Sequence, residues 1–541
     1  MKGNFFETRD MLNNEYKYLI SDMGEWYSIT IKKSGHIIDI RDSYKLLPFS
    51  VKAIGEAFKT KHKKLSIEYV GIRFAGDEIK PEEKEYIAND VLVVSEALQF
   101  MFSQGYKKLT IGSCCLSIAK TFYGGKEVFN MDFPDLSEFP LDKDIYGSSN
   151  VDEYIRKSYR GGWCYLAKGK ENKVFHNGNV FDVNSLYPSV MSGKSKNVYP
   201  VGYPKFWTGD YIPDDVYKDH TYAFIRIRTG FELKSGMLPI IQIKNNFAYR
   251  STEYLETSKI TITGKKLERA ILLGKEITDV VELTLTFVDF LMIQKHYNLY
   301  KTEILDGCYF KAYAGLFDSY INHYAQIKKS STGAMRQLAK LALNSYYGKF
   351  GTNNNSSYKV AYLDNDIVHF ATVQENNKPL VYIPVASAVT SYARKFTIEV
   401  AQANYYGSEQ RGFIYADTDS VHCDLSVEEI KGVELSDTEF LCWKHESSWS
   451  EAIFSHQKTY IEHTENGISV TACGMGKRCK ELLSANIDRK EIELKTENEK
   501  RFMETKLTIA DFKEGLTIPS NIKQKRIKGG VILEDVEFKI R

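Results

Sequence analysis

The order of apolar and polar positions predicts a β-hairpin at residues 413–422. A short apolar, β-prone run enters an acidic segment there, and a second β-prone run leaves it. Asp417 and Asp419 stand two positions apart, so on an ideal strand their side chains would share one face. The pattern therefore predicts a hairpin with two carboxylates at its tip.

A second apolar run, which begins at Val180, predicts a short strand that ends at Asp182. Pro188 follows, at a position where a helix is expected to begin. The pattern places a third carboxylate at the end of a strand.

Residues 331–348 predict an amphipathic helix. Ser331 and Thr332 supply a capping signal, strong helix formers follow, and Gly348 is expected to end the helix. Steps of four, four and three residues form one polar stripe, which consists of Arg336, Lys340, Asn344 and Tyr347. The other side of the helix carries Leu338, Leu341, Ala342 and Ser345. A cationic stripe on such a helix suits a triphosphate.

Length and charge set limits on the interpretation. A chain of 541 residues is too long for one hydrophobic core, and about three to six units are expected. The 72 Lys and Arg residues nearly balance the 70 Asp and Glu residues, so any nucleic-acid surface must come from segregated charge. Two basic clusters exist, at residues 59–64 and 523–528, and each by itself is interpreted as a solvated face.

Cysteine usage and the N-terminal segment bear on localisation. The eight cysteines contain no Cys-x-x-Cys pair, which argues against a zinc knuckle or a disulfide framework and fits a reducing cytosol. The first ten residues lack the apolar core of a signal peptide, and the apolar run from Val91 to Phe102 is interrupted by polar residues. We expect a cytoplasmic protein, in the host cell if it is viral, with no membrane partner.

The carboxylates and the cationic helix indicate a chemistry only when they are considered together. Two like charges as close as Asp417 and Asp419 require a cation, and oxygen-only ligands favour Mg²⁺ or Mn²⁺. An isolated Asp-x-Asp is more simply interpreted as an acidic turn without a metal. With Asp182 and the cationic helix added, the set matches phosphoryl transfer to a 3′-hydroxyl, in which two metal ions activate the nucleophile and cations neutralise the phosphates.

Five segments then resemble the motifs of one family. DVNSLYPS, KLALNSYYG and YADTDS resemble motifs A, B and C of family B DNA polymerases, in that order. Residues 458–460 look like the family's Lys-x-Tyr motif, which contacts the primer strand, and residues 159–162 look like its Tyr-x-Gly-Gly motif. The resemblance is closest to the small protein-primed polymerases of tailed bacteriophages with linear genomes, and it covers nearly the whole chain.

The resemblance implies a mixed α/β, multidomain, right-hand fold with palm, fingers and thumb, and a partial ribonuclease-H-like exonuclease domain. It implies a DNA-directed DNA polymerase that replicates a linear viral genome, initiates on a terminal protein and displaces the non-template strand processively. The expected partners are a DNA primer-template, deoxynucleoside triphosphates and a terminal protein. The expected cofactors are two Mg²⁺ or Mn²⁺ ions.

The family's site residues carry over onto matching positions. By resemblance, Asp182 and Asp419 would hold the metals, Asp417 would complete the carboxylate cluster, and the Val183 carbonyl would be a further ligand. Tyr187 would stack beneath the incoming deoxyribose and exclude a 2′-hydroxyl. The other expected nucleotide contacts are Lys328, Arg336, Lys340, Asn344 and Tyr347. The expected contacts to primer and DNA are Tyr159, Gly161, Gly162, Lys458 and Tyr460. As alternatives, Tyr347 and Tyr460 would be core aromatics and Lys328 a surface lysine.

The resemblance also divides the chain. The expected units are an exonuclease-like domain (1–110), the first part of the palm (111–193), a first insertion near the terminal protein (194–315), the fingers (316–351), a second insertion hairpin (352–386), the second part of the palm (387–480) and the thumb (481–541).

Residues 81–90 resemble the third exonuclease motif of the family, in which Tyr86 and Asp90 would serve proofreading. The first two motifs, Asp-x-Glu and Asn-x-x-x-Asp, do not precede it, so a truncated exonuclease domain is expected. Since one carboxylate cannot hold a metal pair, we expect no 3′→5′ proofreading by this chain alone. A separate exonuclease fragment is a further expected partner, because truncation would leave a sheet edge unpaired.

Two other classes of function compete with this reading. Palms and paired metals also occur in RNA-templated and RNA-making polymerases, but those usually have adjacent aspartates, whereas Thr418 separates Asp417 from Asp419 here. A non-catalytic subunit that binds DNA or terminal protein would not need intact palm motifs. Whether priming uses a protein or an oligonucleotide stays open.

Overall fold

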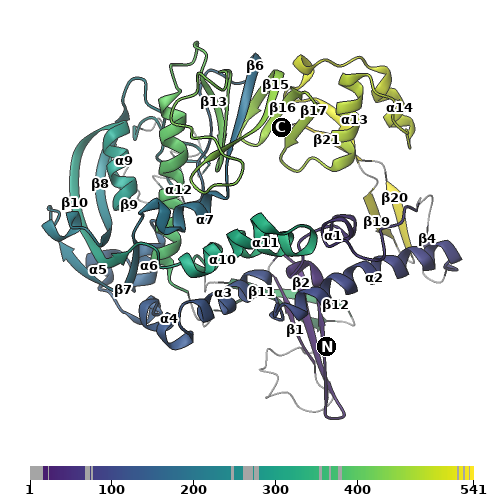
Figure 1. Ribbon diagram of the computed structural model, residues 1–541, viewed down its shortest axis with the longest axis horizontal. Helices are drawn as coiled ribbons and strands as arrows, with labels where there is room; N and C mark the ends of the chain where they lie inside the picture. Colours follow the sequence, from purple (N-terminus) through teal and green to yellow (C-terminus); the bar gives the residue numbers. More distant parts are fainter. Residues whose placement is uncertain are drawn as a thin grey trace.

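The computed structural model describes residues 16–540 except 22, 68–72, 75–76, 245–248, 251, 260–267, 269–271, 273–278, 353–355, 365–366, 376–380, 521–522, 528–529 and 535. The predicted fold class is confirmed, because several sheets and helical layers build a mixed α/β, multidomain molecule (Figure 1). None of the helices described here combines the length and the apolar character needed to cross a bilayer.

An antiparallel seven-stranded sheet occupies the upper part of Figure 1. Its strands, in spatial order, are β17 (Gly467–Ala472), β16 (Thr459–Thr464), β15 (Trp443–His456), β6 (Val174–Val183), β14 (Ser420–Cys423), β13 (Phe413–Asp417) and β5 (Cys164–Leu166). The predicted hairpin is confirmed as β13–β14, in which Asp417 pairs with Ser420. β6 ends one residue later than predicted, because the Val183 amide donates to the Asp419 carbonyl at 2.8 Å.

The helix α12 (Ile383–Ala403) packs against β13 and β14 of this sheet, and α7 (Leu186–Met191) packs against α12. α12 is buried along most of its length, as expected of a helix at the centre of a large core. The predicted domain boundary at residues 386/387 therefore falls inside a helix. The helix expected at Pro188 begins two residues earlier, at Leu186.

Two consecutive helices, α10 (Asp318–Ser330) and α11 (Gly333–Phe350), form the predicted helical region below the sheet (Figure 1). Thr332 is the N-cap residue of α11, as predicted. The prediction that Gly348 ends the helix is wrong, because α11 continues to Phe350, which is buried in the main core. The predicted stripe is confirmed for Arg336, Lys340 and Asn344, which are exposed, whereas Leu338, Leu341 and Ala342 are buried. Tyr347 and Ser345, predicted on opposite sides, are both partly buried.

A separate four-stranded sheet lies within residues 194–315, the range predicted for the first insertion, and has its own core with α9 (Phe287–His296). Its strands, in spatial order, are β7 (Tyr199–Thr208), β10 (Tyr297–Tyr313), β8 (Thr221–Leu233) and β9 (Val281–Thr286). The hairpin β11 (Ser356–Asp364) and β12 (Ile367–Glu375) lies within the range of the second predicted insertion.

The N-terminal part contains the sheet β1 (Tyr16–Ile20), β2 (Trp26–Lys33) and β3 (His36–Arg41), followed by α1 (Val51–Ala57) and α2 (Pro81–Ser103). α3 (Ile111–Phe122), α4 (Lys126–Asp132), α5 (Lys143–Tyr146) and α6 (Val151–Arg156) lead to β5 of the seven-stranded sheet. The C-terminal part has α13 (Lys477–Asp488), α14 (Glu497–Glu504) and the strand pair β18 (Thr517–Pro519) and β21 (Glu537–Lys539).

A strand of the N-terminal part joins two strands of the C-terminal part in one small sheet. Its strands are β19 (Lys523–Ile527), β20 (Gly530–Glu534) and β4 (Arg73–Phe74). The backbone pairing of β4 with β20 joins the N-terminal part to the C-terminal part, so the elements run in a ring around the middle of Figure 1. The seven-stranded sheet and the α10–α11 pair lie on opposite sides of that ring.

Candidate active site

Asp182 and Asp419 lie close together at one end of the seven-stranded sheet. Asp182 pairs with Ser420 in the ladder of β6 and β14, next to the turn that contains Asp419. Thr418 takes a left-handed backbone conformation in this turn, with φ of 64°. Its carbonyl accepts a hydrogen bond of 2.7 Å from Thr397 on α12, so the buried helix fixes the turn.

The negative charges of these two carboxylates repel each other. Burial first, and then the charges of Asp419 and Glu446, raise the pKa of Asp182 to about 7. Burial first, and then the charges of Asp417 and Glu446, raise the pKa of Asp419 as well. Like charges held in such a place favour a bound cation, and carboxylate and carbonyl oxygens are the donors that Mg²⁺ and Mn²⁺ prefer. The donor set therefore fits the predicted metals.

Glu446 was missed by sequence analysis. It is an exposed residue of β15, at a register shift between His445 and Ser447 in the ladder with β6. A bulge of this kind redirects a side chain, and strand register is not readable from the local sequence. No motif around residue 446 would have pointed to the site.

Asp417, the third predicted carboxylate, has a different partner. Lys458 Nζ lies 2.6 and 2.8 Å from its two carboxylate oxygens, and the Tyr415 hydroxyl donates to it at 3.2 Å. Within the described residues, no three His, Cys, Asp or Glu side chains gather closely enough to hold one metal ion. The structure thus brings Asp182 and Asp419 together, and it ties Asp417 to Lys458 instead.

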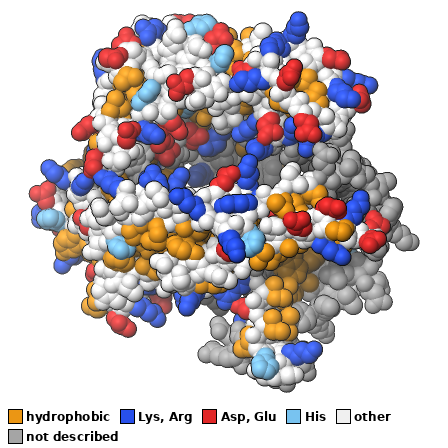
Figure 2. Space-filling view, turned by 45° about the vertical axis from the view of Figure 1, so that its right-hand side comes forward, with side chains coloured by type: hydrophobic (Ala, Val, Ile, Leu, Met, Phe, Trp, Pro, Cys, Tyr) orange, Lys and Arg blue, Asp and Glu red, His pale blue; other side chains and the backbone are white. Residues whose placement is uncertain are grey.

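A cavity of about 720 Å³ separates the carboxylates from α10 and α11. The predicted residues that line it are Asp182, Val183, Tyr187, Lys328, Arg336, Lys340, Asn344, Tyr347 and Asp419. Lys444, Lys329 and Gln337 also line it and were not predicted. The face drawn in Figure 2 has a hollow near its centre, with Lys and Arg side chains along its lower edge and acidic side chains above it.

Lys328 is partly buried at the end of α10. Its Nζ donates to Ser185 Oγ at 2.8 Å, and its backbone carbonyl accepts a 2.6 Å bond from Arg336. Burial first, and then the charges of Arg336 and Lys340, lower its pKa. These contacts contradict the alternative of a plain surface lysine, because Lys328 bridges the helices to the strand-end loop of Asp182.

Tyr187 and Tyr347 stack on each other at the wall of the cavity. Their ring centroids lie 4.0 Å apart with an interplanar angle of 23°. Tyr187 comes from α7 and Tyr347 from α11, so the stack joins the palm to the helical pair. Both rings line the cavity and also contact the main core, which makes them a rigid floor.

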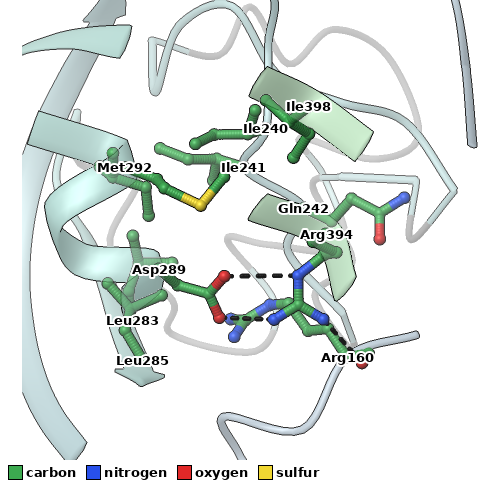
Figure 3. Close-up of a pocket in the computed structure, with 11 residues that line it drawn as sticks. Arg160, Ile240, Ile241, Gln242, Leu283, Leu285, Asp289, Met292, Arg394 and Ile398 are labelled. Carbon is green, nitrogen blue, oxygen red and sulfur yellow. Dashed lines mark hydrogen bonds and ion pairs between the residues drawn. The ribbon is translucent and has the colours of Figure 1, made fainter. Parts of the chain in front are cut away.

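The loop of Tyr159, Gly161 and Gly162 is held from behind by a buried ion pair (Figure 3). Arg394 of α12 binds Asp289 at 2.5 Å and donates to the carbonyls of Arg160 and Gly161 at 2.8 and 2.9 Å. The small cavity drawn in Figure 3, of about 20 Å³, lies between these side chains and apolar residues of the first insertion. Sequence analysis did not single out either charged residue, because they lie 105 positions apart.

Gly162 has a structural reason to be glycine. A Cβ at this position would lie 2.5 Å from the side chain of Thr418, so the loop approaches the carboxylate turn more closely than any other residue allows. At Gly161, a Cβ would meet nothing within 4 Å. Tyr159 is partly buried beside Gly351 at the end of α11, where a Cβ at Gly351 would lie 2.8 Å from the tyrosine hydroxyl.

Lys458 and Tyr460 stand on the hairpin of β15 and β16, beside the carboxylate turn. The Lys458 amide donates to the Tyr415 hydroxyl at 3.0 Å. The Tyr460 ring lies 5.4 Å from both Tyr415 and Phe454. Tyr460 is thus partly a core aromatic, as the alternative held, while Lys458 is exposed enough to reach a ligand.

Tyr86 and Asp90 lie on α2, and neither lines the cavity between the carboxylates and α11. Lys64 Nζ pairs with Asp90 at 2.5 Å and hydrogen-bonds to the Tyr86 hydroxyl. Burial lowers the pKa of Lys64, but the bonds with Asp90 and Tyr86 outweigh it and raise the pKa overall. The interpretation of this lysine as part of a solvated face is therefore wrong.

Comparison with known proteins agrees with this geometry. The family model described as "DNA polymerase type B, organellar and viral" matches residues 3–77 and 73–430. The DNA polymerase of Bacillus phage Nf is 37% identical over 538 residues, which cover 98% of this chain and 86% of the relative. The DNA polymerase of Bacillus phage phi29 is 36% identical over 568 residues, with 100% and 87% covered. That of Streptococcus phage Cp-1 is 32% identical over 549 residues, with 98% and 84% covered.

Solved structures of phi29 DNA polymerase have a similar fold. Phi29 DNA polymerase complexed with primer-template DNA and incoming nucleotide superposes with a TM-score of 0.77 at 34% identity, over 99% of this chain and 87% of that one. The same polymerase complexed with single-stranded DNA gives a TM-score of 0.78. A family match over most of the chain, relatives above 30% identity over nearly its full length and the same fold agree with one another. The chain belongs to the type B DNA polymerases, in the group found in phi29-like bacteriophages, and is a DNA-directed DNA polymerase.

Proposed function

We propose that the cavity between Asp182, Asp419 and α11 is where this polymerase joins a deoxynucleotide to a primer 3′-hydroxyl. Asp182, Asp419 and the Val183 carbonyl would hold two divalent cations, with Asp417 nearby as the third acid. When bound, such ions lower the pKa of the attacking hydroxyl and neutralise the leaving phosphate oxygens. The observation that carries the proposal is the pair of partly buried carboxylates, in which the charge of Asp419 raises the pKa of Asp182, opposite three cationic side chains.

The remaining side chains of the cavity have roles that follow from their charge and shape. Lys328, Arg336 and Lys340 would bind the triphosphate, since each presents a positive charge to the space in front of the carboxylates. The stacked rings of Tyr187 and Tyr347 would form the floor under the sugar and the nascent base pair, and Tyr187 would exclude a 2′-hydroxyl. Asn344, one turn before Tyr347, would contact the same pair.

Lys458, Tyr460 and the loop of Tyr159, Gly161 and Gly162 would bind the primer and the template next to it. They border the turn of Asp417 and Asp419 from two sides, through Lys458 and through the close approach of Gly162. The phi29 relative was solved with primer-template DNA and incoming nucleotide, which supports the same ligands for this chain. Because phosphate contacts would dominate, DNA affinity should fall steeply with salt.

Template-directed synthesis is tested by offering one nucleotide at a time to a primed template. The proposal expects extension only with the deoxynucleotide complementary to the template base, and none after the divalent cations are chelated. Extension with ribonucleotides at a similar rate would favour an RNA-making polymerase. A folded protein that binds the primed template but never extends it would favour a non-catalytic subunit.

Initiation on a terminal protein is a further part of the proposal. The relatives are polymerases of phi29-like phages, and the separate sheet within residues 194–315 offers a surface of its own beside the palm. The test is a reaction without an oligonucleotide, containing the terminal protein of a relative and labelled deoxynucleotide. A covalently labelled terminal protein supports protein priming, and label that appears only when an oligonucleotide is added contradicts it.

We also propose that the site of Tyr86 and Asp90 does not proofread in this chain. The support is the ion pair with Lys64, which places an ammonium group on the carboxylate where a metal ion would be needed. A separate exonuclease fragment would then supply any proofreading. Loss of label from a 5′-labelled primer strand, in the presence of Mg²⁺ and the absence of nucleotides, would overturn this part.

A further inference from the structure

Two buried polar side chains join the hairpins that carry the catalytic and primer-strand residues. His422 lies on β14, three residues after Asp419, and Glu462 lies on β16, two residues after Tyr460. His422 Nδ1 and Glu462 Oε1 are 2.8 Å apart. The two residues are only 2% and 4% exposed.

The contact between His422 and Glu462 joins two strands that are not neighbours in the sheet. β14 and β16 are not neighbours, because β6 and β15 lie between them in the strand order. β15 has register shifts against both β6 and β16, and shifts of this kind commonly bend a strand. Phe454 and Tyr460 of the β15–β16 hairpin lie 5.4 and 5.1 Å from the His422 ring, so the hairpin reaches β14. The pair of His422 and Glu462 is a direct bond between the two hairpins.

The surroundings of the pair are aromatic. The imidazole centroid lies 5.3 Å from Tyr415, 5.4 Å from Phe454 and 5.1 Å from Tyr460. Apolar side chains of the same size would stabilise such a pocket as well as a polar pair, since burying the pair costs desolvation. A hydrogen bond is directional, so the pair allows only one position of the two hairpins relative to each other. Packing between rings tolerates small shifts.

The same hairpin is attached to the carboxylate turn at a second point. The Tyr415 hydroxyl accepts from the Lys458 amide and donates to Asp417, and Lys458 Nζ binds the same carboxylate. The ladder with β6 holds the base of this hairpin, and these bonds attach its tip to the carboxylate turn. The contact of His422 with Glu462 adds a third link, to the strand that follows Asp419.

We propose that His422 and Glu462 are positioning residues for the polymerase reaction. They hold Lys458 and Tyr460 beside the carboxylates of Asp417 and Asp419. The inference rests on the proposed assignment of Lys458 and Tyr460 to the primer strand. Neither side chain of the pair reaches the cavity, so both act through the hairpin they fix. Losing the pair should weaken the hold on the primer terminus and leave nucleotide binding intact.

The test is steady-state extension by the full chain carrying His422→Phe together with Glu462→Leu, a double variant that leaves no unpaired buried charge. We expect the KM for primed template to rise about 10-fold, since small misplacements near the chemistry are costly, while the KM for the nucleotide stays the same. Glu462→Gln, which keeps a hydrogen-bond acceptor opposite His422, should restore the wild-type value. Glu462→Met provides the same comparison should the double variant not fold.

Two controls separate this inference from general loss of stability and from the proposed function. Arg226→Met removes one partner of a buried pair in the first insertion, 8% and 1% exposed, and leaves Asp306 without its cation; it should lower the melting temperature without changing the KM for primed template. Lys458→Ala should raise that KM by itself, and adding it to the pair variant should raise it no further. An unchanged KM in Lys458→Ala would overturn the primer assignment. A KM that rises with Lys458→Ala but stays unchanged in the folded pair variant would overturn the positioning role alone.

Discussion

The two acidic sites of this polymerase differ in what faces the carboxylate. In the palm, Asp182 and Asp419 lie side by side at one wall of an open cavity, and the cations of α10 and α11 lie on its far side. On α2, Asp90 is joined directly to Lys64 and shares it with Tyr86. The repulsion in the palm site favours a bound cation, whereas the carboxylate of the α2 site already has a cationic partner.

Sequence motifs alone do not show this difference. Both sites match a motif of the family by residue type and spacing, yet among the residues that the structure describes only the palm site faces a cavity with cations on the opposite wall. The distinction depends on where a lysine sits. Lys458, beside the palm carboxylates, binds Asp417 and neither Asp182 nor Asp419, whereas Lys64 binds Asp90 itself. A carboxylate motif therefore predicts catalysis only when no neighbouring cation pairs with the carboxylate.

The largest expected effect comes from removing a palm carboxylate. Asp182→Ala should lower the rate of primer extension by roughly 10⁴-fold, because about 5 kcal/mol of transition-state stabilisation is lost with the metal ligand. Single-turnover extension of a primed template measures this rate, and a melting curve confirms the fold. A loss of only a few-fold would mean that Asp182 is no ligand and would remove the contrast with the α2 site.

A large but indirect effect is expected from the support behind the palm. Arg394→Met leaves Asp289 buried without its partner and should lower the free energy of unfolding by about 3–5 kcal/mol. Changing both residues, Arg394→Met with Asp289→Leu, should recover part of the stability but not the two hydrogen bonds to the loop of Gly161. Chemical denaturation measures the stability, and equal stability of wild type and Arg394→Met would contradict the structural role.

A smaller effect is expected on the cationic wall. Lys340→Met should lower kcat/KM for the nucleotide by about 10- to 100-fold, as expected for one hydrogen bond to a charged group worth about 1.5–3 kcal/mol. Gln337→Met, one turn away on the same helix and also at the cavity, serves as the matched control because it carries no charge. Equal losses in the two variants would show that packing, and not charge, accounts for the effect.

The smallest effect is expected on α2. Lys64→Met should change the free energy of unfolding by about 1 kcal/mol and leave primer extension unchanged, because the pair is partly exposed and distant from the cavity. Pairing raises the pKa of Lys64 above 10.5, so its contribution is fully present below that pH and is lost only as the pH passes the raised value. The cost of the substitution should thus be the same at pH 7 and pH 9. Increased degradation of labelled primer in Lys64→Met would show instead that the lysine suppresses a working site.

Local patterns were enough to predict the elements of the site but not its support. Helical periodicity predicts the stripe of Arg336, Lys340 and Asn344, and two β-prone runs predict the carboxylate hairpin. Both signals lie between residues that are close in sequence. Resemblance then supplied the roles. Glu446 and Arg394 were missed because their places depend on strand register and on a contact across 105 positions.

The partnership of Lys64 was misread for a related reason. A run of lysines has the pattern of a solvated face, and nothing in that run indicates that α2 brings Asp90 to one of its members. The end of α11 was placed too early at Gly348, since the burial of Phe350 outweighs the helix-ending tendency of glycine. Tertiary contacts thus decided each point on which the sequence was misleading.

The most direct test of the central claim is to measure extension of a labelled primer on a single-stranded template by wild type, Asp419→Ala and Asp90→Ala, with deoxynucleotides and Mg²⁺. The structure predicts that Asp419→Ala loses extension, and that Asp90→Ala extends like the wild type. It also predicts no primer loss in any of the three when nucleotides are omitted. Extension that survives in a folded Asp419→Ala variant, or that disappears in a folded Asp90→Ala variant, would contradict the account.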